Sequence, residues 1–395
     1  MQILAFSSTL RFNFNKRTPV IALLILILFV SCSHKTPYYK QDNLSTAAST
    51  INPDEITTRI ILFGDGGEPQ PDEPVLQSLR NWASQIPEKT TVFFLGDNIY
   101  PTGMVAKTDP WRPEAERRLI AQLDVIKNSG AKAVFIPGNH DWAKGKPQGL
   151  SNLREQQQFV TQYLNDNESF LPQNGCPGPS VRDFDAVRVI VLDTHWWFQK
   201  HEKPSSECPQ GDKKEILSEL QRLISETPAG KKVIVLAHHP LKTHGPHGGF
   251  FTWKDHIFPL TNLASWMWLP LPIIGSLYPL GRWNIVKSNQ DLNGPLYKDM
   301  VSRLDSIFSQ KPPLIYASGH DHNLQVLDGD STAGFILVSG AGVQEKLNDV
   351  GDGDDTIFAH SHTGFMSVDF LSDGRVSLRV IEPENEIIVF SKWLN

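Results

Sequence analysis

The sequence predicts an α/β fold of two packed β-sheets with helices on their outer faces, and three observations lead to this expectation. Five short apolar runs each pass into an Asp, Asn or His side chain. Stretches with a helical spacing of apolar residues separate the runs, and a strand–helix–strand alternation places parallel strands in at least part of a sheet. After His322 the pattern changes to short strands and turns, which indicates a second, more antiparallel sheet.

The five apolar runs have the length of buried strands and are rich in β-branched and aromatic residues. They span residues 60–63, 91–95, 133–137, 233–237 and 314–318. Ligands of open α/β sheets bind beyond the carboxyl ends of the strands, so the polar side chain after each run is a candidate for a functional site. A capping Asp or a buried His explains a single case, but five cases in series indicate one shared site.

Four helices are expected between the strands. Apolar residues spaced three or four apart occur within 75–86, 119–126, 216–224 and 297–308. Pro113 stands in the first turn of the second helix, and Gly130 ends it. The short strands expected after His322 are 334–338, 364–370, 376–381 and 386–391, with a hairpin turn at Asp373–Gly374.

Length and charge limit the domain organisation and the partners. The chain has 395 residues, but the five runs extend from Ile60 to Ser318, which favours one large domain, residues 56–395, with appendages. Its formal net charge is −6, and no cluster of Lys and Arg follows the first twenty residues. No nucleic-acid partner is therefore expected.

The N-terminal segment, residues 1–32, has the features of a lipoprotein-type signal peptide. Basic residues precede the apolar run Val20–Val30, which is too short to span a bilayer, and Ser31-Cys32 closes the run. This arrangement resembles a bacterial lipoprotein cleavage site, so we expect an exported protein, lipid-anchored through Cys32 at the bacterial cell envelope. The alternative is an ordinary secretory signal. Residues 33–55 are mostly polar and are expected to form a flexible tether.

Two cysteines remain after Cys32. Cys176 and Cys208 form an even pair in an exported protein, so they are expected either to form a disulfide or to stay as two free thiols.

The loops after the five runs carry motifs that resemble those of a known family. The motifs are Gly-Asp-x-Gly at 64–67, Gly-Asp-x-x-Tyr at 96–100, Gly-Asn-His-Asp at 138–141, Val-x-x-His at 235–238 and Gly-His-x-His at 319–322. They resemble those of the calcineurin-like metallophosphoesterases and, more narrowly, of the small-type purple acid phosphatases typified by tartrate-resistant acid phosphatase. The resemblance covers Ile56 to Ile381 and implies two facing mixed sheets, flanked by helices, with metals at one rim of this αββα sandwich.

The same resemblance implies a dinuclear metal centre with a ferric ion and a divalent ion, Fe, Zn or Mn. It assigns Asp65, Tyr100 and His322 to Fe(III), Asn139, His238 and His320 to the divalent ion, and Asp97 to a bridging position. Donors of these types, without Cys, suit hard or borderline ions. The wider superfamily begins with Asp-x-His, but Gly67 occupies that histidine position here, and the hard phenolate of Tyr100 favours a trivalent ion.

Two assignments near the motifs have alternatives. His239 adjoins His238 and is the alternative ligand at that position. Asp193 also follows an apolar strand but matches none of the five motifs, so a capping role is expected for it rather than metal binding.

The implied reaction is hydrolysis of phosphomonoesters by a metal-bound hydroxide, the activity of an acid phosphatase, on a phosphorylated small molecule. The leaving alkoxide needs a proton from a nearby acid, and the candidates are His140, beside Asn139, and His244, in a His-Gly-Pro segment like that of small-type members. Thr243 replaces an acidic residue often found before that segment. The alternatives are hydrolysis of phosphodiesters or pyrophosphates at the same centre and, more remotely, an inactive membrane-anchored binding protein. The oligomeric state stays open.

Two further stretches match neither pattern. An apolar, Pro-rich insertion is expected at about 245–295, and within it Ile257–Gly281 contains no charged residue. This insertion is a lid, a surface that rests on a bilayer, or a segment packed on its own domain. The acidic stretch Asp349–Asp355 lacks the full calcium-loop pattern, so a solvated loop is expected there.

Overall fold

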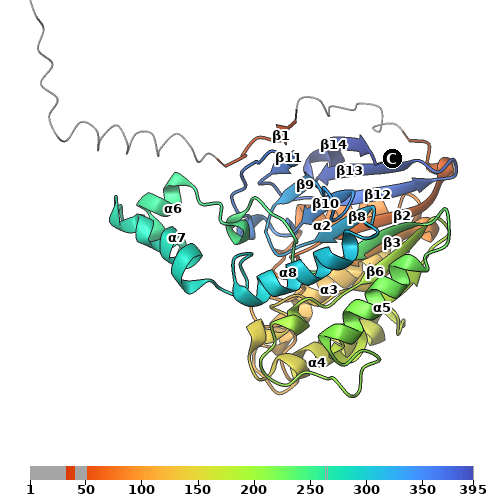
Figure 1. Cartoon of the computed structure of the whole chain (residues 1–395), viewed down its shortest axis with the longest axis horizontal. Helices are drawn as coiled ribbons and strands as arrows, with labels where there is room; N and C mark the ends of the chain where they lie inside the picture. Colours follow the sequence, from red (N-terminus) through yellow and green to blue (C-terminus); the bar gives the residue numbers. More distant parts are fainter. Residues whose placement is uncertain (1–32, 41–50, 263, 265, 395) are drawn as a thin grey trace, which may run out of the picture.

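The computed structural model describes residues 33–40, 51–262, 264 and 266–394. The expected signal peptide, including Cys32, lies outside the described residues. The described chain forms two mixed β-sheets with flanking helices, which confirms the predicted fold class (Figure 1).

The larger sheet has eight strands in the order β1-β11-β9-β10-β8-β7-β6-β5. These strands are β1 (Tyr38–Tyr39), β5 (Ser180–Asp183), β6 (Val187–Val191), β7 (Lys232–Leu236), β8 (Ile315–Ser318), β9 (Leu324–Asp328), β10 (Phe335–Ser339) and β11 (Thr356–His360). The smaller sheet has six strands in the order β14-β13-β12-β2-β3-β4. They are β2 (Ile56–Phe63), β3 (Thr90–Phe94), β4 (Lys132–Phe135), β12 (Phe365–Leu371), β13 (Val376–Glu382) and β14 (Ile387–Trp393).

The strands are divided between the sheets differently from the sequence-based expectation. The strands after His322 were expected to form a separate sheet, but β9, β10 and β11 join the larger one, where β10 runs parallel to β8. The smaller sheet instead combines both ends of the domain, because β12 pairs antiparallel with β2, with Val368 opposite Ile60. Strand pairing joins residues far apart in the chain, so a local pattern does not reveal it.

Alternate residues of the parallel strands face two different hydrophobic cores. Ile60 and Leu62 of β2 belong to the core that fills the space between the sheets. Their neighbours Ile61 and Phe63 belong to the core beneath the helices. Successive side chains of a strand point to opposite faces, so both faces of β2 are buried. This explains why the run is apolar throughout instead of alternating with polar residues.

Five longer helices cover the sheets: α2 (Pro74–Ala83), α3 (Arg112–Ser129), α4 (Gly149–Leu164), α5 (Lys213–Ser225) and α8 (Pro295–Phe308). Four of them were expected, and Gly130 ends α3 in the left-handed conformation with φ 79°. The helix α4 was not expected because its buried face includes the polar side chains of Asn152 and Gln156. The short helices α6 (Trp253–Ile257) and α7 (Leu277–Gly281) lie in the apolar insertion, which projects from the sandwich (Figure 1).

The beginning of the described chain is attached to the domain. Cys176 and Cys208 form a disulfide, the first of the two states that the sequence allows. Residues 33–40 were expected to belong to a flexible tether, but β1 pairs antiparallel with β11 and places Tyr38 opposite Ala359. Lys35 Nζ also lies 2.8 Å from Asp349 Oδ1. The acidic stretch Asp349–Asp355 therefore helps to hold this segment.

Among the described residues, no helix combines the length and the hydropathy needed to cross a bilayer.

Candidate metal centre

The structure brings the seven predicted metal ligands together at one rim of the sandwich. Each follows the carboxyl end of a strand: Asp65 after β2, Asp97 and Tyr100 after β3, Asn139 after β4, His238 after β7, and His320 and His322 after β8. The smaller sheet supplies the first four and the larger sheet the three histidines. The site therefore depends on how the two sheets pack, since neither sheet contains the whole set.

One group of ligands surrounds the carboxylate of Asp65. The Tyr100 hydroxyl lies 3.1 Å from Asp65 Oδ1 and 3.1 Å from His322 Nε2. The same His322 nitrogen is 3.4 Å from Asp65 Oδ1. A carboxylate oxygen, a phenol oxygen and an imidazole nitrogen thus point toward one another.

A second group surrounds the side-chain oxygen of Asn139. This oxygen lies 3.0 Å from His238 Nε2 and 3.2 Å from His320 Nδ1. Asp97 connects the two groups, because ligand atoms of Asp65, Asp97 and His238 all lie within 4.8 Å of one another. Two cations about 3.5–4 Å apart need such a shared carboxylate.

Hydrogen bonds on the outer side of each histidine determine which nitrogen faces the site. His238 Nδ1 lies 2.9 Å from the Leu95 carbonyl oxygen, His320 Nε2 2.8 Å from that of Gln290, and His322 Nδ1 2.7 Å from that of Lys346. A carbonyl oxygen only accepts, so the ring nitrogen facing it carries the proton. The inward nitrogen of each ring then has a free lone pair, which is the tautomer that metal binding requires.

The backbone around the two carboxylates is tightly packed. Asp65 and Asp97 have φ values of 59° and 53°, an uncommon left-handed conformation for residues other than Gly. Asp65 Oδ2 accepts from the His320 amide and Asp97 Oδ1 from the His140 amide, both at 2.8 Å. A Cβ atom at Gly138 would lie 2.3 Å from Asp97 Oδ1, so no larger residue fits there.

The charge distribution of the site also fits cations. Asp65 and Asp97 are both 1% exposed. Burial and the neighbouring Asp65 raise the pKa of Asp97 well above its usual range. Burial and the same carboxylates raise the pKa of Tyr100 as well. Bound cations would offset the cost of placing two carboxylates close together, and a phenolate would form only beside a strongly positive ion. The donor set fits hard or borderline metals.

A cavity of ≈ 270 Å³ opens over these ligands. It is lined by Asp97, Asn139, His140, Lys144, His247, Gln290, His320 and His322. Of the two predicted proton donors, only His140 is in this lining. His140 Nδ1 lies 2.8 Å from the Pro101 carbonyl oxygen, and Nε2 lies 3.8 Å from Asp97 Oδ2.

The structure places the other predicted donor, His244, outside the cavity lining. Its Nε2 atom lies 2.7 Å from Asp355 Oδ1, and its backbone amide donates to Gln325. The imidazole in the cavity belongs to His247, whose ring is stacked on His320 with 4.0 Å between ring centroids. Both histidines stand in the same short segment and each precedes a Gly, and the His-Gly-Pro pattern favoured His244.

Sequence reasoning also missed the groups that hold His247. Its Nδ1 atom lies 2.8 Å from Asp291 Oδ1, and Arg282 donates to both oxygens of the same carboxylate at 2.6 and 3.0 Å. Although burial opposes it, hydrogen bonds from His247 and Arg282 keep the pKa of Asp291 below its usual range. Both Arg282 and Asp291 lie in the apolar insertion, where the sequence showed no pattern of a functional site.

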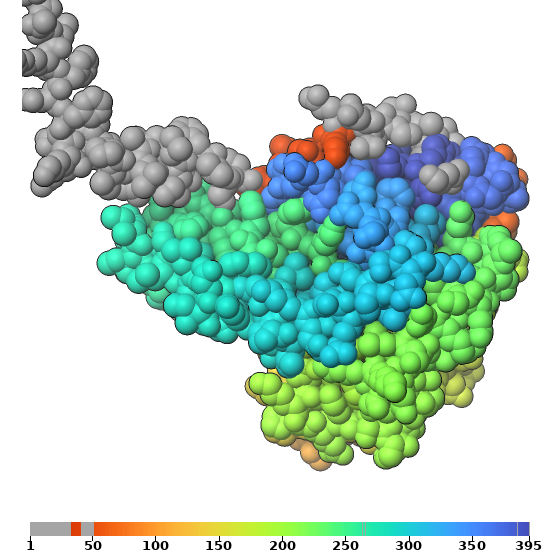
Figure 2. Space-filling view, in the orientation of Figure 1, coloured from red at the N-terminus to blue at the C-terminus, as the bar shows by residue number. Residues whose placement is uncertain are grey.

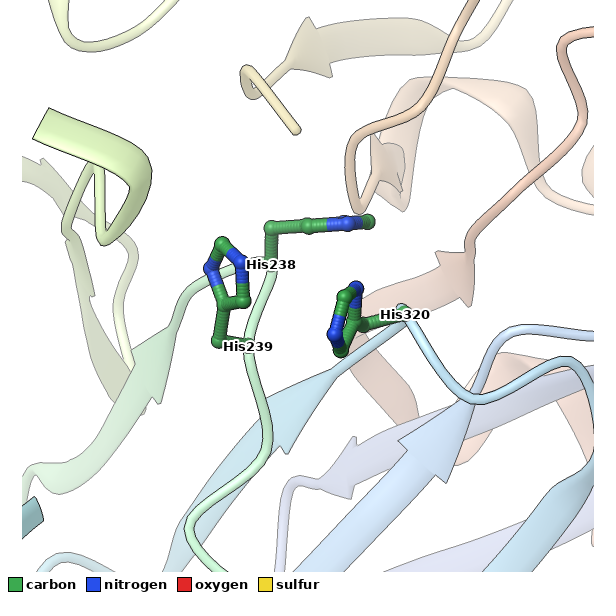
Figure 3. A group of neighbouring side chains, drawn as sticks. All are labelled: His238, His239 and His320. Atoms are coloured by element: carbon green, nitrogen blue, oxygen red, sulfur yellow. The ribbon is translucent and has the colours of Figure 1, made fainter. Parts of the chain in front are cut away.

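The alternative ligand His239 lies beside His238, and Figure 3 shows both rings with that of His320 (Figure 3). Both of its ring nitrogens have other partners, since Nδ1 is 2.8 Å from Thr194 Oγ1 and Nε2 is 3.1 Å from Gln290 Oε1. The geometry thus favours His238, whose Nε2 atom faces Asn139.

Asp193 has the capping role that was expected for it. Its carboxylate accepts from the backbone amides of His195 and Trp196 and from the Trp142 indole. Burial raises its pKa to about 7.

The sandwich fold and the site together define a metal-dependent hydrolase of phosphate esters. A family model described as calcineurin-like phosphoesterase matches residues 25–260, more than half of the chain. The chain therefore belongs to the calcineurin-like phosphoesterase family. The two histidines after β8 lie beyond the matched residues. No curated protein matches the chain.

Solved structures share the fold at low sequence identity. GAP50, the anchor in the inner membrane complex of Plasmodium, is 17% identical, with a TM-score of 0.51, and the match covers 86% of this chain and 89% of that one. A purple acid phosphatase, PPD1, from yellow lupin (Lupinus luteus) seeds is 15% identical, with a TM-score of 0.49, and the match covers 85% of this chain and 53% of that one. At 17% identity the likeness to GAP50 concerns the fold alone.

Proposed function

We propose that this protein is an exported, lipid-anchored acid phosphatase that hydrolyses phosphomonoesters at a centre of Fe(III) and a divalent ion. The observation that carries the proposal is the position of the Tyr100 hydroxyl, 3.1 Å from both Asp65 Oδ1 and His322 Nε2. A phenol there supplies a hard, anionic donor that suits a trivalent ion.

The loop that begins with Gly64 has no room for a histidine at residue 67, the metal donor of the Asp-x-His pattern. A Cβ atom at Gly67 would lie 2.5 Å from the Asp97 carbonyl oxygen and 2.7 Å from the Ile99 nitrogen. No histidine fits at residue 67 without moving the Asp97 loop. The Tyr100 amide donates to the Gly67 carbonyl oxygen at 3.0 Å, so this close packing also holds the backbone of the phenol donor.

The residues of the cavity have separate roles in the proposed reaction. A bound dinuclear centre supplies a water of lowered pKa and neutralises phosphate charge. The lining residue Lys144 carries an ammonium group that binds a phosphate oxygen. His140 and His247 stand at the same cavity, and either ring, in its imidazolium form, donates the proton that the leaving oxygen needs. His247 is oriented for this role, because Asp291 accepts the hydrogen bond from its Nδ1 atom.

Metal analysis of the full-length protein, combined with a phosphate-release panel, tests this proposal. We expect iron with a second metal, a visible absorption band from tyrosinate bound to Fe(III), and faster release from monoesters than from diesters or pyrophosphates. A colourless, fully loaded and oxidised protein with divalent ions alone would contradict the ferric assignment. Faster diester or pyrophosphate hydrolysis would support the second reaction class, and a metal-loaded protein without turnover would support a binding protein.

The anchoring part of the proposal rests on the sequence before Ser33. Replacement of Cys32 by Ser is expected to abolish incorporation of a labelled fatty acid and to block processing or release the protein from the membrane fraction. Equal lack of lipid label in the wild type and the variant would contradict a lipid anchor. Labelling is the decisive readout, because another membrane contact can retain the variant.

A further inference from the structure

Nearly all large hydrophobic side chains that the described structure exposes lie in one segment. This segment, residues 253–286, is called the apolar protrusion below. Its most exposed members include Ile285 at 82%, Trp266 at 78%, Ile273 at 69% and Leu277 at 68%. Outside the protrusion, the described residues include a single exposed large hydrophobic side chain, Ile387. Figure 1 shows α6 and α7 apart from the sandwich, and Figure 2 shows this part as a lobe at the edge of the molecule.

The protrusion differs from an ordinary surface element in which side chains face solvent. Its large apolar side chains are exposed, while some of its polar groups bond to one another. His256 Nδ1 lies 3.0 Å from Ser276 Oγ and joins α6 to the turn before α7. Single exposed apolar side chains are normal on a protein surface, but a contiguous group of them marks an interaction site. The protrusion is therefore a surface that needs a partner.

The charged residues of the protrusion favour an anionic interface. Its cations are Lys254 and Arg282. Arg282 is paired with Asp291, just after the protrusion, whereas Lys254 Nζ lies 5.1 Å from the centre of the Trp268 ring. Its one acidic residue, Asp255, is used internally, because its carboxylate accepts from Thr252 and Asn262. Lys254 is therefore the cation that the protrusion offers to an anionic partner, in a chain of net charge −6. Trp and Lys together on an apolar element are typical of the headgroup region of a bilayer.

The position of Ser33 and His34, the residues after the expected lipidation site, points to the same partner. The Val350 amide donates to Ser33 Oγ at 3.2 Å, and the His34 amide donates to the Val350 carbonyl oxygen at 2.9 Å. The next residue, Gly351, packs on the Phe250 ring at the base of the protrusion, where a Cβ atom would come within 2.4 Å of the ring. The expected lipidation site precedes Ser33 directly. A membrane that holds the N-terminal segment is thus within reach of the protrusion.

We propose that the apolar protrusion docks into a lipid bilayer, with its Leu and Ile side chains among the acyl chains, its Trp side chains at the boundary between acyl chains and headgroups, and Lys254 at anionic headgroups. This surface does not depend on the proposed chemistry. It also has a consequence for the catalytic cavity, because His247 and Gln290, just before and just after the protrusion, both line that cavity. Docking therefore holds the cavity at the membrane surface.

Tryptophan fluorescence tests the protrusion without any signal from the N-terminal segment, because that segment contains no Trp. The chain has ten Trp residues, and all of them follow residue 81. Full-length protein is reconstituted in vesicles of phosphatidylethanolamine and phosphatidylglycerol, with and without bromine on the acyl chains. We expect brominated lipid to quench the fluorescence, and we expect the double variant Trp266→Phe/Trp268→Phe to lose at least half of this quenching. The matched control Trp111→Phe/Trp393→Phe removes two partly exposed Trp residues elsewhere and is expected to keep the quenching.

Absence of quenching in the wild type, or equal quenching in both double variants, would overturn the proposal. The proposal would also be overturned if brominated lipid does not quench the fluorescence and the protein instead self-associates. If Trp266→Phe/Trp268→Phe weakens that self-association, the surface binds a second copy of the chain. A second variant, Ile273→Ser/Leu277→Ser, keeps all ten Trp residues and is expected to reduce the quenching at least twofold. Thermal unfolding and metal content serve as folding controls, so the test does not require phosphatase activity.

Discussion

The His247 imidazole donates a hydrogen bond from Nδ1 to the buried carboxylate of Asp291, 2.8 Å away, while its ring is stacked on that of His320. The carboxylate fixes the tautomer of the ring and leaves Nε2 for the cavity. Since Asp291 belongs to the insertion, the part of the chain least like the family motifs orients an imidazole of the candidate site. His247 therefore joins His140 as a candidate proton donor, in place of His244.

The first prediction concerns protonation of the leaving group. Loss of a general acid slows alkyl esters more than nitrophenyl esters, because an alkoxide leaves only with a proton, and the effect amounts to roughly 10²–10⁴-fold. We expect His247→Ala or His140→Ala to show this selective loss of kcat on the alkyl ester. His244→Ala serves as a control, because His244 is bonded to Asp355 outside the cavity. Selective loss in His244→Ala, or equal losses on both esters in all variants, would contradict the assignment, provided that metal content is unchanged.

The second prediction concerns the phenol ligand. Tyr100→Phe removes one hydroxyl and is expected to abolish the visible absorption band while the protein stays folded. Absorption spectra and metal analysis of the loaded, oxidised variant measure the effect. An unchanged band would mean that another group produces it. Tyr163→Phe, which removes a hydroxyl bonded to Asp124 on the surface, is a suitable control.

The third prediction concerns the cation of the cavity. Lys144→Gln removes the charge and shortens the side chain by one atom, and a hydrogen bond to a charged group contributes roughly 1.5–3 kcal/mol. We therefore expect KM for a phosphomonoester to rise about tenfold or more, with a smaller change in kcat. Lys146→Gln is the matched control, since Lys146 is also exposed but is not in the cavity lining. Equal KM values for both variants would exclude a phosphate contact by Lys144.

The fourth prediction concerns acid stability. Burial lowers the pKa of His195 from its ordinary value of 6.5 to about 3. Between these values the unfolded chain takes up a proton that the folded chain does not, so the free energy of unfolding falls as the pH drops, by at most ~1.4 kcal/mol per pH unit. His195→Leu removes the imidazole and is therefore expected to flatten the dependence of Tm on pH in this window. The substitution breaks no hydrogen bond of the ring, because neither ring nitrogen has a hydrogen-bond partner in the described structure. The exposed control His201→Leu should leave the slope unchanged.

The fifth prediction concerns a buried ion cluster in the smaller sheet. Arg59 Nε donates to Asp369 Oδ1 at 2.8 Å, and Arg379 donates to the other oxygen of the same buried carboxylate. Asp369→Asn leaves two buried cations without a counter-charge, so we expect a loss of about 3–5 kcal/mol in the free energy of unfolding. Asp373→Asn makes the same change in a surface pair with Arg375, where less than about 1 kcal/mol is expected. Denaturant unfolding compares the two, and similar losses would contradict the argument.

Several features of this protein were predictable because they depend on near neighbours in the chain. The apolar runs before Asp65 and Asp97 indicated buried strands, and the residues after them indicated ligands at strand ends. The structure brings these predicted ligands together, while the metal that they bind stays a prediction. The helix α3 was predictable for the same reason, since Pro113 and Gly130 mark its ends locally.

The sequence by itself thus determined the ligand types, most of the helices and the presence of an apolar insertion. The tertiary structure decided which strands pair, which histidine reaches the cavity and which side of the insertion faces solvent. His244 and His247 stand three residues apart and each precedes a Gly, but they have different distant partners, Asp355 for one and Asp291 for the other. The pairing of β12 with β2 also joins opposite ends of the domain. Such contacts form only when the whole chain packs, so no local pattern of residues contains them.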